Sequence, residues 1–324
     1  MNRLICRSLV AAALLSCGAA AAQTPQTREA LEVIQLQPNF YMIAGAGGNI
    51  AVQIGPEGVV VVDSGTAAHA PAVVAAIRKL TDQQIRYIIN TSADPDHVGG
   101  NEIIAKAGRA LGAISPASAA NGGAAAIIAS ETVLDWMSTP DAAGKTPYPV
   151  AAWPTESYSR KQKTLYLNNE GIQVLQAPAA HSDGDSIVFF RRSDVVVTGD
   201  IFDTTRFPVI EVDKGGSIQG ELDAVNRLID IVIPSIPLPF KDGGTRVIPG
   251  HGRICEQAEI VEYRDMLTII RDTIQHLIGK GLTLAQVKAA NPTQGFRGRY
   301  GADSGPWTTD MFVEAVYKNL TVKK

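Results

Sequence analysis

The most informative part of the chain reads Asn90-Thr91-Ser92-Ala93-Asp94-Pro95-Asp96-His97-Val98-Gly99-Gly100-Asn101. It overlaps the end of an apolar run at 85–90 and gathers two carboxylates, one imidazole and two glycines within a few residues. A calcium loop of the EF-hand type does not fit, because Val98 stands at a ligand position and Pro95 disrupts the loop. Imidazole and carboxylate ligands together suit zinc, iron or manganese better than calcium. This segment therefore predicts part of a metal site.

Three further segments combine a strand end, a glycine and a potential metal ligand. They are Ala180-His181-Ser182-Asp183-Gly184-Asp185, Thr198-Gly199-Asp200 and Pro249-Gly250-His251-Gly252. Each follows an apolar run and is interrupted by glycine, so we expect all of them to project from the same edge of a sheet. The chain has only five His, and three of them stand at such junctions. The sequence thus predicts that these side chains converge.

Strands and helices alternate along the rest of the chain. Apolar runs predict strands at 33–36, 40–43, 50–54, 58–63, 85–90, 164–167, 172–176, 186–190, 195–198 and 245–248. Helical spacing predicts helices at 70–80, 101–108, 221–231, 257–280 and 309–320. The run at 58–63 does not alternate, which predicts a strand covered on both faces. Residues 138–159 are expected to form a long loop, and nothing divides residues 23–324, so we predict a single α/β domain.

Taken together, these segments resemble the metallo-β-lactamase fold superfamily. The likeness rests on Val61-Val62-Asp63-Ser64-Gly65, Asp96-His97-x-Gly99-Gly100-Asn101, His181, Asp200 and Gly250-His251-Gly252. These pieces occur in the order that the family shows, from about residue 33 to past residue 251. The resemblance implies a four-layer αββα sandwich and a metal-dependent hydrolase.

The metal loop of that family reads His-x-His-x-Asp-His and serves two metal subsites. The resemblance implies that one subsite is retained here, with Asp96, His97, His251 and the bridging Asp200 as ligands. Such a ligand set, with an open position, is typical of a catalytic ion. Asp63 is similar to the acid that braces the metal loop without touching the ion.

The other subsite departs from the family, because Ser92 and Asp94 stand where its two leading His would be. The resemblance leaves His181, Asp94 and the bridging Asp200 there as ligands, since the neutral hydroxyl of Ser92 is a poor one. Two interpretations of Ser92 and Asp94 stay open, a decayed subsite and a retuned one.

A charge count bears on how many ions the cleft holds. Asp94, Asp96 and Asp200 would bring three negative charges together, and without a cation at least one of them would take up a proton. One divalent ion would leave −1, and two would leave +1, which a bridging hydroxide would neutralise. We expect one tightly bound Zn²⁺ and a second ion that is weak or absent, with iron as the alternative metal.

The function that follows is hydrolysis of a small ester, lactone or amide through a metal-bound hydroxide. By its position in the family's loop, Asp96 is expected to orient the nucleophile or shuttle a proton, with Asp94 as the alternative general base. Two other classes remain open, a non-catalytic metal-binding protein with a degenerate site and a diiron redox protein. Ser92 speaks against the diiron class, whose members keep the first His, and the substituted subsite speaks against true β-lactamase activity.

Composition narrows the expected partners. Lys and Arg total 29 against 32 Asp and Glu, for a formal net charge of −3, and 45% of the residues are hydrophobic. This excludes a disordered chain and disfavours a nucleic-acid binder, which needs basic side chains to release phosphate counterions. A small-molecule substrate is the partner that the composition allows.

The first residues read as a secretory signal peptide at 1–22, which predicts a periplasmic or secreted protein. Arg3 and Arg7 precede an apolar, Ala-rich run with cleavage expected after Ala22. The run is too short and too Ala-rich for a membrane span. Lipoprotein processing at Cys17, which would leave a lipid anchor, is the alternative. Either cut leaves Cys255 as the only internal cysteine and excludes a disulfide scaffold.

Overall fold

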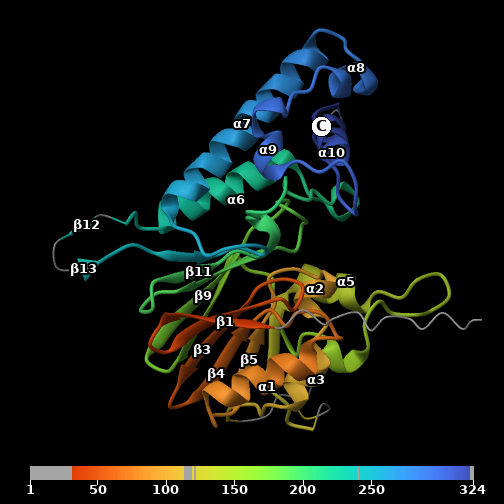
Figure 1. Cartoon of the computed structure of the whole chain (residues 1–324). Coiled ribbons are helices and arrows are strands. Elements are labelled where there is room, and N and C mark those ends of the chain that lie inside the picture. Colours follow the sequence, from red (N-terminus) through yellow and green to blue (C-terminus); the bar gives the residue numbers. More distant parts are fainter. Residues whose placement is uncertain (1–30, 113–118, 120–121, 236, 239–240, 322–324) are drawn as a thin grey trace, which may run out of the picture. The chain divides into compact units, whose positions relative to one another are not determined.

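The computed structural model describes residues 31–112, 119, 122–235, 237–238 and 241–321. The chain from Leu31 onward forms one compact unit. The predicted signal peptide at 1–22, with Cys17, lies outside the described residues. Two large sheets lie at the centre of the unit, and helices cover their outer faces (Figure 1).

The first sheet has seven strands that follow one another in chain order. They are β1 (Glu32–Gln37), β2 (Phe40–Ala44), β3 (Ile50–Gly55), β4 (Gly58–Val62), β5 (Ile85–Ile89), β6 (Ala126–Ser130) and β7 (Glu156–Tyr158). Pairing is antiparallel from β1 to β4 and parallel from β4 to β7. Because β4 and β5 are parallel, Asp63 and the segment that begins at Asn90 leave the sheet at the same edge.

The second sheet has five strands in the order β14-β11-β10-β9-β8. They are β8 (Gln162–Leu167), β9 (Glu170–Gln176), β10 (Ser186–Phe190), β11 (Val195–Val197) and β14 (Arg246–Ile248). The strands β11 and β14 pair in parallel, so the segments that carry Asp200 and His251 also leave from one edge. A separate short pair is formed by β12 (Pro237–Leu238) and β13 (Lys241–Asp242).

The strand β4 shows how the sequence builds the layers. Its Val60 and Val62 pack into the core between the two sheets, with Phe40 of β2 and Phe190 of β10. The alternate residues of β4 pack on the other face, against helices of the outer layer. The run without alternation therefore is a strand buried on both faces, as predicted.

Helices complete the outer layers. The first sheet is covered by α1 (Ala70–Leu80) and α3 (Asn101–Lys106), and the second by α6 (Ile218–Ile231) and α7 (Gln257–Gly279) (Figure 1). The helix α5 (Glu131–Ser138) packs in a smaller cluster with Ala129 of β6. The remaining helices are α2 (Pro95–Val98), α8 (Leu284–Ala289), α9 (Arg297–Tyr300) and α10 (Thr309–Thr321). The predicted four-layer αββα sandwich is confirmed.

Some elements differ from their predicted bounds or were not predicted. The helix α6 begins three residues before the predicted start at 221, because the Ser217 hydroxyl accepts a hydrogen bond from the Gly220 N–H and caps it. The predicted loop at 138–159 ends in the edge strand β7. Neither β6 nor α5 was predicted, since the Ala-rich segment before α5 gives a weak strand pattern.

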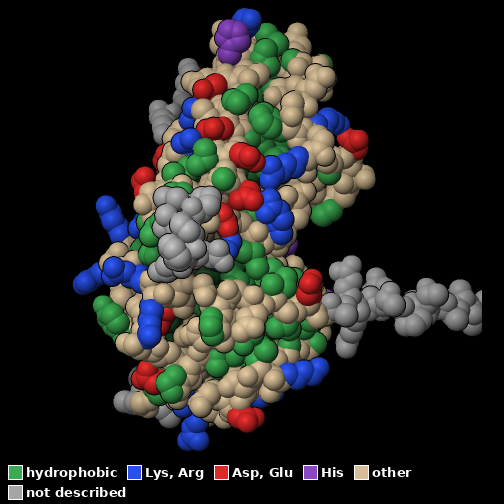
Figure 2. Space-filling model, turned by 60° about the vertical axis from the view of Figure 1, so that its left-hand side comes forward, with side chains coloured by type: hydrophobic (Ala, Val, Ile, Leu, Met, Phe, Trp, Pro, Cys, Tyr) green, Lys and Arg blue, Asp and Glu red, His purple; other side chains and the backbone are tan. Residues whose placement is uncertain are grey.

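The surface on one face of the molecule carries acidic and basic side chains interspersed with one another (Figure 2). Such mixing gives no extended field of one sign over that face. Among the described residues, none of the helices combines the length and the apolar character that crossing a bilayer requires.

Candidate metal centre

Four predicted ligands meet where the two sheets present their strand ends. Asp96 and His97 lie on α2, Asp200 lies on a short 3₁₀ helix (Gly199–Ile201) after β11, and His251 follows β14. One ligand atom of Asp96, of His97 and of His251 lies within 4.8 Å of the other two. Asp200 Oδ1 lies 3.1 Å from His97 Nε2 and 3.4 Å from His251 Nε2. These four residues are called the Asp96 cluster below.

The backbone permits this approach at Gly250. A Cβ atom at that position would lie 2.2 Å from Asp200 Oδ1, which is far closer than atoms can pack. Only glycine therefore lets the segment before His251 pass beside the Asp200 carboxylate. Any other residue at position 250 would displace the Asp200 carboxylate and so disturb the Asp96 cluster.

Asp63 contacts His97 on the side of the ring that faces away from Asp200. The Asp63 side chain accepts hydrogen bonds from the Thr91 N–H at 2.8 Å and the Thr91 hydroxyl at 2.7 Å. It lies 2.8 Å from His97 Nδ1, and because a carboxylate accepts, this ring nitrogen donates. His97 Nε2 is thereby directed toward Asp200.

The Asp96 cluster fits a divalent cation. His251 Nε2 is buried without a hydrogen bond, although it lies 3.2 Å from Asp96 Oδ2. In the described part of the chain, Asp96 and Asp200 form ion pairs with His97 and His251 and with no Lys or Arg. Two carboxylates and two imidazoles that converge without a fixed cation match the ligand chemistry of zinc and related metals.

Zinc binding by this cluster should release protons. Burial by itself lowers the pKa of His97, but the carboxylates of Asp200 and Asp63 outweigh burial and hold that pKa well above its usual range. A ligating imidazole must be unprotonated on the nitrogen that binds, so an ion has to displace a proton from His97. The apparent zinc affinity should therefore fall as the pH is lowered, by about tenfold per pH unit for one displaced proton. Calorimetric zinc titrations in two buffers of different ionisation enthalpy count the protons, and heats independent of the buffer would contradict this expectation.

A second group of potential ligands consists of Asp94, His181 and Glu211, called the Asp94 cluster below. His181 Nδ1 donates to the Val209 carbonyl oxygen at 2.7 Å, and its Nε2 lies 2.7 Å from Asp94 Oδ2. Glu211 Oε2 lies 3.8 Å from His181 Nε2. The ammonium of Lys214 lies between the two carboxylates, 3.0 Å from Asp94 Oδ1 and 2.6 Å from Glu211 Oε2.

This second cluster differs from the subsite that the sequence suggested. Glu211 and Lys214 were not predicted as site residues. The segment that contains them has no His and matches no recognised motif; it reads Val209-Ile210-Glu211-Val212-Asp213-Lys214. Charged residues inside an apolar segment were the only local signal. Ser92 is buried, and its hydroxyl accepts a hydrogen bond from the Asp94 N–H at 3.2 Å, so it shapes the turn. Among the described residues, Asp200 forms ion pairs with His97 and His251, and His181 pairs with Asp94 and Glu211.

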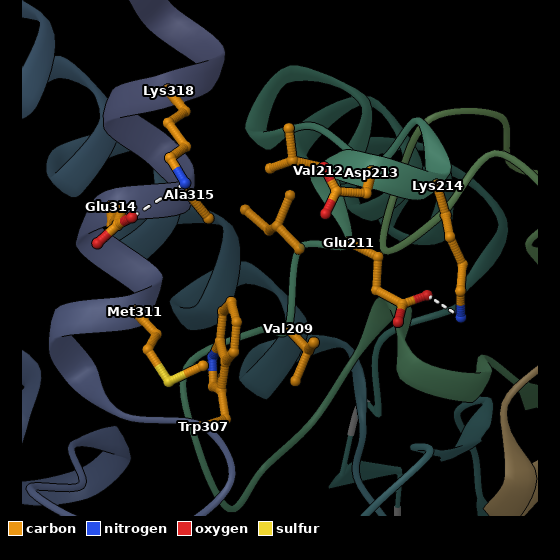
Figure 3. A pocket seen from close by; sticks show the side chains of 11 residues that line it. Val209, Glu211, Val212, Asp213, Lys214, Trp307, Met311, Glu314, Ala315 and Lys318 are labelled. Carbon is orange, nitrogen blue, oxygen red and sulfur yellow. Dashed lines mark ion pairs between the residues drawn. The ribbon is translucent and has the colours of Figure 1, made fainter.

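A cavity of about 570 Å³ adjoins the Asp94 cluster. Glu211 and Lys214 line one side, and Trp307 and Met311 line the other, with Val209 between them (Figure 3). The cavity therefore has an apolar side and a charged side. A small molecule with an apolar part would fit such a space.

Comparison with known proteins supports the fold. The family model described as the metallo-beta-lactamase superfamily matches residues 43–235. The stereoselective inverting sec-alkylsulfatase Pisa1 from Pseudomonas sp. matches with a TM-score of 0.61 at 15% identity, over 89% of this chain and 50% of that one. A metallo-beta-lactamase from Pontibacter korlensis matches with a TM-score of 0.53 at 16% identity, over 74% of this chain and 99% of that one.

The chain thus spans half the length of the alkylsulfatase that it resembles. The DIM-1 metallo-beta-lactamase gives a similar result, with a TM-score of 0.53 at 14% identity, over 74% of this chain and 97% of that one. At these identities the likeness establishes the fold. No curated protein matches the chain.

Proposed function

Because the chain belongs to the metallo-beta-lactamase superfamily, whose family model matches residues 43–235, we propose that it is a metal-dependent hydrolase of a small ester, lactone or amide. The observation that carries the proposal is the buried His251 Nε2, which has no hydrogen bond and faces the carboxylates of Asp96 and Asp200. A buried ring nitrogen that makes no hydrogen bond is costly unless another group satisfies it. A metal ion is the group that satisfies imidazoles and carboxylates together.

The ligands of the proposed ion are Asp96, His97, His251 and Asp200, and zinc is the metal that we propose. A bound zinc ion supplies Lewis acidity and lowers the pKa of a coordinated water toward neutrality. Asp63 holds the His97 ring so that its Nε2 faces the ligand set. The protein's own part in the chemistry is then to place the substrate and to move a proton.

Asp96 is the better candidate for the proton transfer, and Asp94 the poorer one. Asp94 has both oxygens occupied, one by His181 and the other by Lys214. Neither oxygen of Asp94 is therefore free to accept a proton from water. The Asp96 side chain is 30% exposed, so solvent reaches it. In the proposed reaction Asp96 accepts a proton from the attacking water and passes it to the leaving group as the carbonyl–heteroatom bond breaks.

The cavity beside the Asp94 cluster is the proposed binding place for the substrate. Trp307, Met311 and Val209 offer it an apolar wall, and Lys214 offers a positive charge at the edge nearest the cluster (Figure 3). Similar structures carry the names sec-alkylsulfatase and metallo-beta-lactamase. Sulfate esters and β-lactams therefore belong among the substrates to be tried beside esters, lactones and amides.

A substrate panel tests the proposal. Aryl esters, lactones, amides, a secondary alkyl sulfate and a β-lactam are incubated with the zinc-loaded protein, with protein treated with a chelator, and with chelated protein given zinc again. We expect turnover of at least one substrate that chelation abolishes and zinc restores. Zinc-loaded protein that turns over none of them, or turnover that survives complete removal of metal, would overturn the proposed function.

Export to the periplasm or secretion is a further part of the proposal and rests on the predicted signal peptide. We expect the mature protein, isolated from cells that express the full chain, to begin at Gln23. Amino-terminal sequencing measures this directly. A lipid-modified terminus at Cys17 would favour the anchored alternative, and an uncut Met1 would contradict export through this segment.

A further inference from the structure

The two ligand clusters differ in whether a lysine or arginine is already paired with their carboxylates. In the described part of the chain, the Asp96 cluster has no lysine or arginine ion-paired to its carboxylates. In the Asp94 cluster, Lys214 Nζ contacts one oxygen of Asp94 and one oxygen of Glu211. The lysine side chain is 30% exposed, so its ammonium is partly shielded from water beside these acids.

We propose that Lys214 is a built-in cation in the place of a second metal ion, and that Asp94, His181 and Glu211 form a latent metal site that Lys214 keeps closed. The inference rests on the proposed function in one respect, namely that the Asp96 cluster binds metal. It adds a structural reason for the expected single ion, namely the side chain of Lys214.

The geometry of the three potential ligands supports a latent site. One atom from each of Asp94, His181 and Glu211 lies within 4.8 Å of the other two, which is close enough for one ion to reach all three. His181 is almost fully buried, and its bond to the Val209 carbonyl directs Nε2 toward the carboxylates. This is one imidazole and two carboxylates, a ligand set that zinc accepts.

Charge explains why the lysine excludes an ion. With His181 neutral, as a ligating imidazole must be, Asp94 and Glu211 together carry −2, and Lys214 reduces this to −1. A divalent ion added beside Lys214 would leave +1 and would place two cations against each other in a partly desolvated site. Without the lysine the same ion would leave a neutral cluster. Removing the positive charge of Lys214 should therefore make the binding of a divalent ion at the Asp94 cluster favourable.

The backbone holds Lys214 in this position. It ends a short 3₁₀ helix (Val212–Lys214), and Gly215 follows in the left-handed region at φ +81°. The Lys214 carbonyl oxygen accepts a hydrogen bond from the Asp183 N–H at 3.0 Å, which ties the lysine to the loop that carries His181. A Cβ at position 215 would lie 3.0 Å from the Asp183 Cβ, so the two segments are in close contact. These backbone contacts hold the Lys214 residue beside the Asp94 cluster.

The test is the zinc content of variants. Wild type, Lys214→Met, Lys214→Met/Glu211→Gln and the control Lys163→Met are saturated with zinc, desalted and assayed by elemental analysis, with a thermal melt to show that each is folded. The control removes a similarly buried lysine that pairs with Glu156 on another strand. Lys214→Gln, which keeps a polar group near Asp94, repeats the measurement if the Met variant does not fold.

We expect one zinc per chain in wild type and in Lys163→Met, two in Lys214→Met, and one again when Glu211→Gln is added. A folded Lys214→Met that still binds one zinc would overturn the inference and leave the proposed function intact. Two zinc ions in wild type would also overturn it, because Lys214 would then not exclude the second ion. No zinc in wild type would overturn the proposed function as well.

Discussion

Replacing His251 by alanine should abolish hydrolysis and release the metal. His251 Nε2 lies 3.2 Å from Asp96 Oδ2 and 3.4 Å from Asp200 Oδ1, so it faces both carboxylates of the cluster. Loss of a metal ligand removes several kcal/mol of transition-state stabilisation. A loss of about 4 kcal/mol corresponds to a fall of about 10³-fold in kcat/KM. The measurement is kcat/KM on the best substrate of the panel, together with zinc content after desalting.

His276→Ala is the matched control, because His276 is an exposed residue on α7. It should keep the zinc content and the turnover of the wild type. A folded His251→Ala variant that hydrolyses as fast as the wild type would show that the Asp96 cluster is not the catalytic centre.

Replacing Phe190 by alanine should produce the largest loss of stability among the changes considered. Phe190 of β10 is fully buried, and its ring packs edge-on against Phe40 of β2, with ring centroids 4.8 Å apart. This pair joins the two sheets, so the truncation removes contacts on both sides of the inner core. A Phe-to-Ala change at such a site costs about 3–5 kcal/mol. Urea unfolding at equilibrium measures the change in the free energy of unfolding.

Tyr166→Ala serves as the comparison on the same sheet, because Tyr166 lies on the edge strand β8 and is 82% exposed. A change at such an exposed position stays within about 0.5 kcal/mol. If Phe190→Ala and Tyr166→Ala destabilised the protein equally, the two sheets could not be packed face to face as described.

The fold was predictable because its strands carry strong local patterns. The run at 59–62 consists of four valines with no polar residue between them, which is typical of a strand covered on both faces. The strand β6 was missed because the residues before α5 are mostly small, and alanine carries little strand signal. Here the neighbouring strands β5 and β7 determine the conformation, which a local pattern cannot show.

The Asp96 cluster was predictable for a different reason. His251 stands between two glycines just after an apolar run, and His97 belongs to the segment that follows another such run, so the resemblance to the family's motifs could be read from the sequence. Glu211 and Lys214 could not be identified in this way. They lie in a segment between β11 and α6 that matches no motif of the family. The contact between Lys214 and Asp94 joins positions far apart in the chain, and only the tertiary structure brings an acid and a lysine there together.

The most direct test of the proposed metal centre is the metal content of wild-type protein purified without added metal. Elemental analysis of the desalted protein gives the identity of the ion and its number per chain. We expect one zinc ion per chain. Chelation should remove this ion, and incubation with zinc should restore it. Protein that contains no metal, and that takes up none when zinc is supplied, would contradict the metal-dependent hydrolase.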